Sequence, residues 1–259
     1  MEHTVLVTGA TAGFGEATAR RFLAHGHQVI ALGRRVERLE ALRASLPAEQ
    51  QKKLLTLAVD VCDSAKVDHL AASLPAEFAS VTVLVNNAGL ALGLEPAHKA
   101  FLTDWDRMID TNIKGLVHMT RAFLPGMVER QCGHVINLGS VAANYPYPGG
   151  NVYGGTKAFV KQFSLNLRAD LIGTPVRVTC VEPGMCSGTE FSNVRFKGDD
   201  NKAGQVYSGV KALSADDVAE AIYWSANLPS HMNINVVELM PVQQAFNAFN
   251  VHRGEFKTS

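Results

Sequence analysis

Short apolar, β-branched segments alternate with longer amphipathic segments along the 259 residues of the chain. In the amphipathic segments, apolar residues recur at three- and four-residue spacing, as in 36–46 and from Thr103 to Met127, which predicts helices. Nearly continuous apolar strands are typical of strands that are buried on both faces, and strand–helix alternation predicts right-handed crossovers into one parallel sheet. The predicted strands are 4–8, 28–32, 54–59, 81–87, 134–139, 176–181 and 235–239.

This alternation continues through almost the whole chain, without a repeat, a low-complexity tract or a linker. We therefore expect a single doubly wound α/β domain over residues 1–259. Residues 184–211 interrupt the pattern and are rich in Gly, Ser, Asn and Asp, which predicts a binding loop or lid. In the polar tail 241–259, Phe246 and Phe249 predict docking onto a neighbouring subunit or onto the lid, or else the tail frays.

The composition narrows the classes of partner. Lys+Arg and Asp+Glu both number 24, so no net charge draws the chain to nucleic acid or to an anionic membrane. The stretch MEHTVLVTGA lacks the basic flank and the long apolar run of a signal peptide, and no apolar run reaches about 18 residues, so we expect neither a secretory leader nor a membrane span. The four cysteines, at 62, 132, 180 and 186, include no CxxC pair, so we expect reduced thiols, a cytoplasmic protein and no metal site.

A glycine-rich turn, TGATAGFGEATARRF, connects the first predicted strand to a helix. Gly9, Gly13 and Gly15 let the backbone turn tightly and approach a pyrophosphate, and the start of a helix offers unpaired N–H groups. The spacing GxxxGxG differs from the general GxGxxG fingerprint, and three glycines could also be plain turn chemistry. Their position in the first βαβ unit favours a dinucleotide site that includes Thr11 and Phe14.

The second predicted strand ends in ALGRR, with Arg34 and Arg35 at the place where a site for NAD usually carries an acid. A carboxylate would repel a 2′-phosphate, whereas guanidinium groups bind it through charge-assisted hydrogen bonds. The alternative is a solvated basic start of a helix, which is unfavourable for the helix dipole unless an anion neutralises it. The sequence therefore favours NADP(H) over NAD(H).

Two further strand ends are expected to contact the cofactor. Asp60 and Val61 follow the third strand, where the Asp60 side chain could meet the adenine ring. Asn86 and Asn87 begin an Asn-Asn-Ala-Gly run at the end of the fourth strand, where small and amide residues suit contact with the ribose. The same run could also be an ordinary turn.

A second group of residues suggests proton transfer. Ser140 ends the fifth strand, Tyr153 follows near the start of the next helix, and Lys157 lies one turn further on the same face. A nearby ammonium favours the phenolate, so Tyr153 could exchange a proton with a hydroxyl while Ser140 holds that oxygen. Asn112, in the preceding helix, could hold a water that relays protons. Each residue also has an ordinary structural explanation, such as an exposed Tyr/Lys pair.

Together, TGxxxGxG (8–15), NNAG (86–89), Asn112, Ser140 and YxxxK (153–157) resemble the short-chain dehydrogenase/reductase family, from about residue 3 to 240. The resemblance implies a Rossmann fold with a seven-stranded parallel sheet. It also implies that Asn112, Ser140, Tyr153 and Lys157 are catalytic, and usually a homotetramer.

Three stretches make the chain more similar to one group of that family, the bacterial NADP-dependent 3-hydroxy acid dehydrogenases: NNAGLALGLEPAHKA, YPYPGGNVYGGTKAFV and EFSNVRFKGDD. This group includes dehydrogenases of serine and L-allo-threonine. The similarity implies oxidation of the C3 hydroxyl of a small 3-hydroxy acid, with reduction of malonic semialdehyde as the reverse type of reaction.

The chain departs from the family pattern after its Pro-Gly motif. The threonine expected five residues after Pro183 comes one position later, at Thr189, and Gly188 takes its place. We expect the loop to bulge and restore the contact. The cofactor contacts expected from this loop are Pro183, Gly184, Met185 and Thr189, with Cys186 as a small residue that fills the loop.

The acid group of a 3-hydroxy acid needs a cation or backbone N–H groups. Arg195 and Lys197 in the lid are the candidates, unless both are solvated and paired with Asp199 and Asp200. A broad carbonyl or 3-oxoacyl reductase that uses NADPH is the alternative enzyme. A nucleotide-sensing regulator that has lost turnover is the alternative of another class, but such a protein would be expected to lack Tyr153 or Lys157, and this chain has both.

Overall fold

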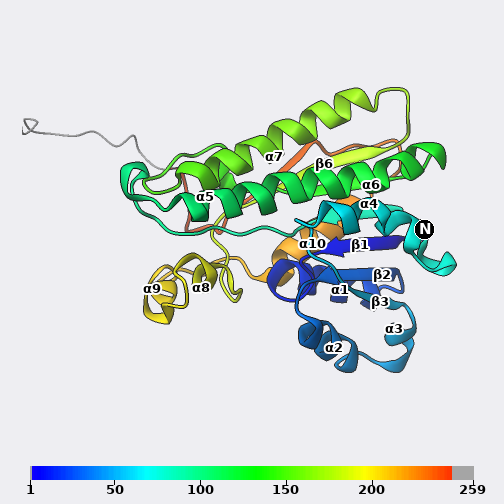
Figure 1. The fold of residues 1–259 in the computed structure, drawn as a ribbon, viewed down its shortest axis with the longest axis horizontal. Coiled ribbons are helices and arrows are strands. Elements are labelled where there is room, and N and C mark those ends of the chain that lie inside the picture. Colours follow the sequence, from blue (N-terminus) through cyan, green and yellow to red (C-terminus); the bar gives the residue numbers. More distant parts are fainter. Residues whose placement is uncertain (1, 247–259) are drawn as a thin grey trace, which may run out of the picture.

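A seven-stranded parallel sheet forms the centre of the protein, whose computed structural model describes residues 2–246 (Figure 1). The strand order is β3-β2-β1-β4-β5-β6-β7, and every neighbouring pair is parallel. The predicted fold class is thus confirmed. The strands are β1 (Thr4–Thr8), β2 (Gln28–Gly33), β3 (Leu54–Ala58), β4 (Val83–Asn86), β5 (His134–Leu138), β6 (Arg177–Pro183) and β7 (Val236–Leu239).

Helices cover both faces of this sheet because its buried side chains alternate between them. Val5 and Val7 of β1 pack in a core with Phe22 of α1, and Leu6 between them packs in the opposite core with Met119 of α6. In Figure 1, α1, α2 and α10 lie on one side and α4, α6 and α7 on the other. The helices are α1 (Gly13–Ala24), α2 (Val36–Ala44), α3 (Ala48–Lys52), α4 (Ser64–Ser73), α5 (Leu102–Ile109), α6 (Leu116–Glu129), α7 (Asn151–Asp170), α8 (Phe191–Arg195), α9 (Asp200–Gln205) and α10 (Ala215–Ala226).

The strand order reverses between β1 and β4, and this switch point locates the site. The chain winds outward from β1 to β3, returns to β4, and then winds in the other direction to β7. In open parallel sheets, ligands bind in the crevice outside the carboxyl ends of the strands at such a point. The turns after β1, β2, β4 and β5 should therefore converge on one cavity.

The long helix expected from Thr103 to Met127 is in fact interrupted. Helix α5 ends at Ile109, a π-helical segment η3 (Asp110–Gly115) follows, and α6 begins at Leu116. π-Helical turns inside α-helices are rare and often occur at functional sites. Apolar spacing cannot reveal such a turn, because one extra residue shifts the periodicity only locally.

The lid, residues 184–211, is more regular than its composition predicted. It contains α8 and α9, which project beyond the layers of the sheet (Figure 1). The tail contacts the lid within the same chain, because Gln244 Oε1 accepts a hydrogen bond from Met185 N at 2.7 Å. The ring of Phe246 lies 4.7 Å from that of Tyr145, whereas Phe249 is outside the described residues. Over residues 2–246, no helix has both the length and the apolar character that a membrane crossing needs.

Candidate active site

A cavity of about 910 Å³ opens at the carboxyl ends of the strands, as the switch point requires. It collects most of the predicted site residues from separate elements. Four predicted residues do not line it: Gly15, Asn86, Asn112 and Lys197. Those that do are Gly9, Thr11, Gly13, Phe14, Arg34, Arg35, Asp60, Val61, Asn87, Ser140, Tyr153, Lys157, Pro183, Gly184, Met185, Thr189 and Arg195.

The glycine turn after β1 can accommodate a pyrophosphate. Gly9 and Gly13 have φ values of +68° and +53°, in the left-handed region that glycine adopts without strain. A Cβ on Gly15 would lie 2.3 Å from the Gly9 carbonyl oxygen, so Gly15 permits the tight packing without facing the cavity. Ala12 precedes α1 without a side-chain cap, which leaves the first N–H groups of the helix for an anion.

Cationic side chains stand at the end of β2, beside this turn. Arg35 donates to the Thr11 hydroxyl at 3.1 Å and forms an ion pair with Glu190 at 2.9 Å. Arg34 pairs with Asp60 over 3.6 Å. Both arginines line the cavity, so guanidinium groups lie where the 2′-phosphate of NADP would be recognised, and the residues present fit that cofactor.

The two asparagines at the end of β4 have different surroundings. Asn86 is buried and donates to Thr120 of α6 and Asn137 of β5, each over 2.9 Å. Its side chain therefore connects β4 to a neighbouring strand and to a covering helix. Asn87 lines the cavity, and its amide donates to the Thr8 carbonyl at 2.8 Å. This bond joins the ends of β1 and β4 at the switch point.

Tyr153 and Lys157 are both buried, with 8% and 7% of their surfaces exposed, so the exposed Tyr/Lys pair considered from the sequence is wrong. Lys157 Nζ lies 5.9 Å from the centroid of the Tyr153 ring and donates to the Leu138 carbonyl at 2.7 Å. Ser140 follows β5 closely, lines the same cavity, and accepts a hydrogen bond from Ala142 N at 3.1 Å. The structure thus brings the predicted proton-transfer group together.

Burial dominates the ionisation of this group. It raises the pKa of Tyr153 to about 12, while a hydrogen bond with Ser140 and the charge of Arg195 act in the opposite direction. Burial also lowers the pKa of Lys157 to about 8. Burial therefore outweighs the favourable charges, and the ammonium of Lys157 donates to the Leu138 carbonyl. Deprotonation of the phenol near neutral pH would need a further positive charge beside it, such as that of an oxidised nicotinamide ring.

Asn112 acts within the protein rather than in the cavity. It lies in the π-helical segment η3 and is 1% exposed. Its Oδ1 accepts from Leu90 N at 2.9 Å, and its Nδ2 donates to the Leu90 carbonyl at 2.9 Å and to Thr156 Oγ1 at 3.0 Å. The side chain therefore holds the loop after β4 against α7; both Nδ2 hydrogens are used, and Oδ1 keeps one acceptor position for a further donor.

The loop after β6 turns at Gly188 and brings Thr189 to the cavity. Gly188 has a φ of +70°. A Cβ on Gly13 would lie 3.2 Å from the Thr189 Cβ, so the threonine packs directly on the glycine turn. Cys186 is buried, which raises the pKa of its thiol to about 12. It is therefore suited to filling the loop and not to nucleophilic attack.

Arg195 projects from the lid helix α8 into the cavity, beside the proton-transfer group. Its guanidinium carbon lies 5.1 Å from the centroid of the Tyr153 ring and 5.2 Å from that of Phe191. Nη2 donates to the Tyr147 hydroxyl at 2.5 Å, and the buried Nε has no hydrogen-bond partner within residues 2–246. Arg195 forms no ion pair with a carboxylate in that part of the chain, so it offers an uncompensated charge to an anionic group.

Lys197 lies outside the cavity. Its ammonium pairs with Asp104 at 2.8 Å and stands 4.7 Å from the centroid of the Phe101 ring. The alternative considered from the sequence, that Arg195 and Lys197 pair with Asp199 and Asp200, is also wrong. Asp199 pairs with Lys202 at 3.3 Å, and Asp200 accepts from Asn193.

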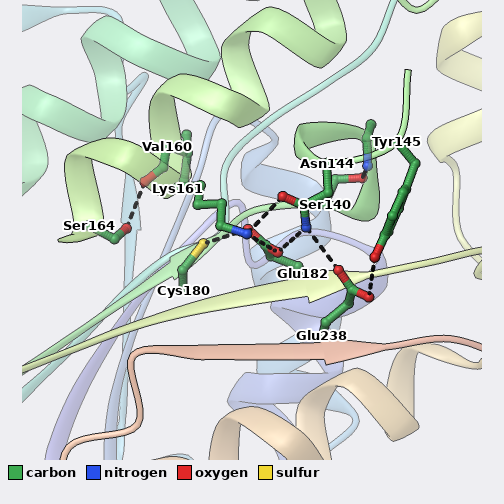
Figure 2. Close-up of polar contacts among 10 residues, drawn as sticks. Ser140, Asn144, Tyr145, Val160, Lys161, Ser164, Cys180, Glu182 and Glu238 are labelled. Carbon is green, nitrogen blue, oxygen red and sulfur yellow. Dashed lines mark hydrogen bonds and ion pairs between the residues drawn. The ribbon is translucent and has the colours of Figure 1, made fainter. Parts of the chain in front are cut away.

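A polar network behind Ser140 was not predicted from the sequence (Figure 2). Glu182 is fully buried and accepts from Asn144 Nδ2 at 2.8 Å and from Lys161 Nζ at 3.3 Å. Asn144 also donates to Glu238 of β7 at 2.8 Å. Since Asn144 follows the Ser140 turn and Lys161 lies on α7, the buried carboxylate joins the two elements that carry the proton-transfer group. The only signal in the sequence was an acid directly before the Pro-Gly motif.

Tyr147, Phe191 and Gln244 also line the cavity and were not predicted. Their contacts depend on tertiary packing. Tyr147 belongs to YPYPGG, which precedes α7, and aromatic residues next to a predicted site are the one signal that could have indicated it.

Comparison with known proteins agrees with this site. The family model described as short chain dehydrogenase matches residues 3–200, which is most of the chain. The chain belongs to the short-chain dehydrogenase family. This match confirms the family expected from the motifs.

Individual short-chain dehydrogenases are similar over nearly their full lengths. The NADP-dependent 3-hydroxy acid dehydrogenase YdfG of Salmonella typhi is 63% identical, over 96% of this chain and 99% of its own. Serine 3-dehydrogenase of Agrobacterium fabrum is 53% identical, over 98% and 99%. A solved structure, the closed form of serine dehydrogenase complexed with NADP⁺, superposes with a TM-score of 0.94 at 61% identity, over 96% of this chain and 99% of that one.

Proposed function

We propose that this protein is an NADP-dependent dehydrogenase that oxidises the C3 hydroxyl of small 3-hydroxy acids, such as serine, and reduces the corresponding 3-oxo acids. The observation that carries the proposal is the placement of Arg195 against Tyr153 in one cavity. It puts a cation for an acid group next to a phenol for a hydroxyl group. The names of the similar proteins support the same substrate class.

The chain supplies proton transfer and positioning in this reaction. NADP⁺, when bound, supplies the acceptor of the hydride. As the phenolate, Tyr153 would take the proton of the substrate C3 hydroxyl, while the Ser140 hydroxyl hydrogen-bonds the same oxygen and holds it. Lys157 holds α7 to the end of β5 through the Leu138 carbonyl and places its ammonium near the phenol.

Arg195 binds the acid group of the substrate, and Tyr147 fixes its guanidinium by accepting a hydrogen bond. A guanidinium can hold a carboxylate through two parallel hydrogen bonds, which fixes its orientation as well as its position. A substrate with both an acid and a 3-hydroxyl is then held at two points. Two-point binding places the C3 hydroxyl at Tyr153 and favours 3-hydroxy acids over simple alcohols.

For the cofactor, Arg34 and Arg35 bind the 2′-phosphate, and the glycine turn with the start of α1 binds the pyrophosphate. The loop from Pro183 to Thr189, together with Asn87, contacts the nicotinamide end. Asp60 pairs with Arg34 and, with Val61, forms the adenine side of the cavity.

The test is a substrate panel assayed by NADP⁺ reduction with the purified protein. We expect turnover with serine, allo-threonine, 3-hydroxyisobutyrate or 3-hydroxypropionate, and values of kcat/KM for simple secondary alcohols that are at least about tenfold lower. Equal rates with alcohols and acids would instead indicate a broad carbonyl reductase. No turnover with any of these substrates would contradict the proposed activity.

The homotetramer implied by the family resemblance is part of the proposal. Large apolar side chains are exposed on α5 and on α7, namely Leu102 at 69% and Phe159 at 38%. Light scattering after size exclusion would measure the mass directly. We also propose a cytoplasmic location, which is supported by four cysteines that are all free, one of them the exposed Cys62.

A further inference from the structure

A carboxylate of the lid, that of Glu190, forms ion pairs with two arginines that follow β2. Glu190 Oε2 lies 2.9 Å from Arg35 Nη2, and Glu190 Oε1 lies 3.3 Å from Arg38 Nη2. The three side chains are between 39% and 54% exposed, so the ion pairs are accessible to solvent and can exchange. Arg35 forms no other ion pair in the part of the chain that the structure describes.

The same guanidinium is assigned to the 2′-phosphate of NADP in the proposed function. Arg35 lines the cavity beside Thr11, and Glu190 lines it as well. A phosphate monoester carries about −1.5 to −2 charge at neutral pH, and it prefers the planar fork of arginine just as a carboxylate does. The phosphate and Glu190 therefore compete for Arg35, and they repel each other when both are close.

We propose that Glu190 is a determinant of cofactor selectivity, because it acts as an internal substitute for the 2′-phosphate. NADP must displace the carboxylate from Arg35, whereas NAD, which has no 2′-phosphate, leaves the ion pairs with Arg35 and Arg38 intact. Glu190 thus weakens the binding of NADP and leaves that of NAD unchanged. This inference rests on the proposed use of NADP, but not on the identity of the substrate.

Glu190 connects the cofactor side of the cavity to the lid helix α8. Glu190 lies between Thr189, which packs on the glycine turn, and α8, which ends with Arg195 at the Tyr153 ring. Its ion pairs therefore fasten the start of α8 to the β2–α2 connection.

The test compares binding by the wild-type protein and by Glu190→Gln, which removes the charge and keeps the shape. Isothermal titration calorimetry would measure NADP⁺, NAD⁺, 2′-AMP and 5′-AMP, none of which requires turnover. We expect Glu190→Gln to bind NADP⁺ and 2′-AMP about three- to tenfold more tightly, the range of two exposed ion pairs. Binding of NAD⁺ and 5′-AMP should stay within about twofold of the wild type.

Glu220→Gln is the matched control. Glu220 also pairs with an arginine, Arg21, at the surface between α10 and α1, but it does not line the cavity. It should leave all four affinities unchanged. A second variant, Glu190→Ala, repeats the measurement without the side chain, and thermal unfolding reports whether each variant is folded.

A double-mutant cycle identifies the partner. With Arg35→Ala as the background, Glu190→Gln should increase the affinity for NADP⁺ much less than it does in the wild type, because the competition acts mainly through Arg35. Equal or weaker binding of NADP⁺ by Glu190→Gln, or the same gain for NAD⁺, would overturn the proposal. Serine-dependent reduction of NADP⁺ by the wild-type protein tests the proposed function separately, so the two can fail independently.

Discussion

The guanidinium of Arg195 lies over the ring of Tyr153, with 5.1 Å between the guanidinium carbon and the ring centroid, although Arg195 ends α8 and Tyr153 lies in the first turn of α7. The relationship serves two purposes. The charge of Arg195 acts to lower the pKa of the phenol against burial, and its Nε, which has no partner among residues 2–246, offers a donor to a substrate acid. Binding an acid group at Arg195 would partly cancel its effect on Tyr153.

Arg195→Ala should raise the KM for serine by about ten- to a hundredfold, because a charge-assisted contact of this kind typically contributes about 1.5–3 kcal/mol. Lys197→Ala is the control from the same lid, and it should change KM by less than about twofold because its ammonium pairs with Asp104. Steady-state kinetics of both variants is the measurement. An unchanged KM in Arg195→Ala would remove the arginine from substrate binding.

Tyr153 should remain protonated to high pH in the protein without cofactor, because burial raises its pKa to about 12. Ultraviolet difference titration of the wild type against Tyr153→Phe isolates this one phenol. We expect no signal from Tyr153 below about pH 10, and a transition at lower pH with NADP⁺ present, because a nearby positive charge favours the phenolate. If bound NADP⁺ leaves the transition in place, Tyr153 is not the base.

Tyr153→Phe should also lower kcat by at least about a thousandfold while the Kd for NADP⁺ changes little. The variant loses the proton acceptor but keeps the ring that packs against Phe191 and Arg195. Rapid kinetics and a fluorescence titration would separate these effects. Turnover that survives would assign proton transfer to another group.

Lys157→Met should abolish most activity and yet increase stability. Burial lowers the pKa of this lysine from 10.5 to about 8, which means that folding disfavours its charged form. The cost is fully present below about pH 8 and is relieved as the pH rises through 8 toward 10.5. Allowing for the hydrogen bond to Leu138 that is lost, we expect a gain of about 1–2 kcal/mol at pH 7.

Denaturant unfolding at pH 7 and at pH 10 would measure this gain. It should shrink at the higher pH, where the wild-type lysine is neutral in the folded state. If Lys157→Met is less stable than the wild type at both pH 7 and pH 10, the lysine stabilises the fold and its burial carries no net cost.

The strands and the cofactor turn could be predicted because local patterns determine them. Buried parallel strands are continuously apolar, and the turn after β1 needs glycine at Gly9 and Gly13 for their positive φ values. The π-helical segment around Asn112 could not be predicted, because its cause is a tertiary one. The side chain of Asn112 bonds Leu90 and Thr156, which are distant in the sequence.

Residue types at the site were predictable, but the partners of charged residues were not. Arg195 and Lys197 are two positions apart and seemed equivalent in the sequence, yet one faces Tyr153 and the other Asp104. The turn of α8 and the residues that follow it decide which side chain enters the cavity. Glu190 was not predicted for the same reason, since its partners on β2–α2 come close only through the fold.

The double variant Arg34→Ala, Arg35→Ala should weaken the binding of NADP⁺ by about tenfold or more and that of NAD⁺ by much less. Only NADP⁺ carries the 2′-phosphate that the two arginines bind. The ratio of the two KM values, measured in the same buffer, is the readout. Salt should reduce the difference, because both side chains are partly exposed. Equal losses for both cofactors would mean that the arginines support the fold of the β2–α2 connection and do not read the phosphate.

A group of histidines at the opposite end of the sheet should make the protein sensitive to acid. Burial lowers the pKa of His3 to about 4 and also lowers the pKa values of His27 and His134. His27 Nδ1 accepts a hydrogen bond from the backbone N–H of His3 at 3.1 Å, which a protonated Nδ1 could not do.

Because the folded pKa values lie below the ordinary value of 6.5, the unfolded chain binds more protons as the pH falls below 6.5. The stabilisation is fully present above that pH and is lost between about 6.5 and 4. After a reduction for screening by solvent, His3 alone should account for a loss of about 1 kcal/mol in the free energy of unfolding over this pH range. Urea unfolding across this range should show a smaller loss in His3→Gln than in the wild type, whereas the exposed His231→Gln should follow the wild type. Parallel curves for wild type and His3→Gln would place the acid sensitivity elsewhere.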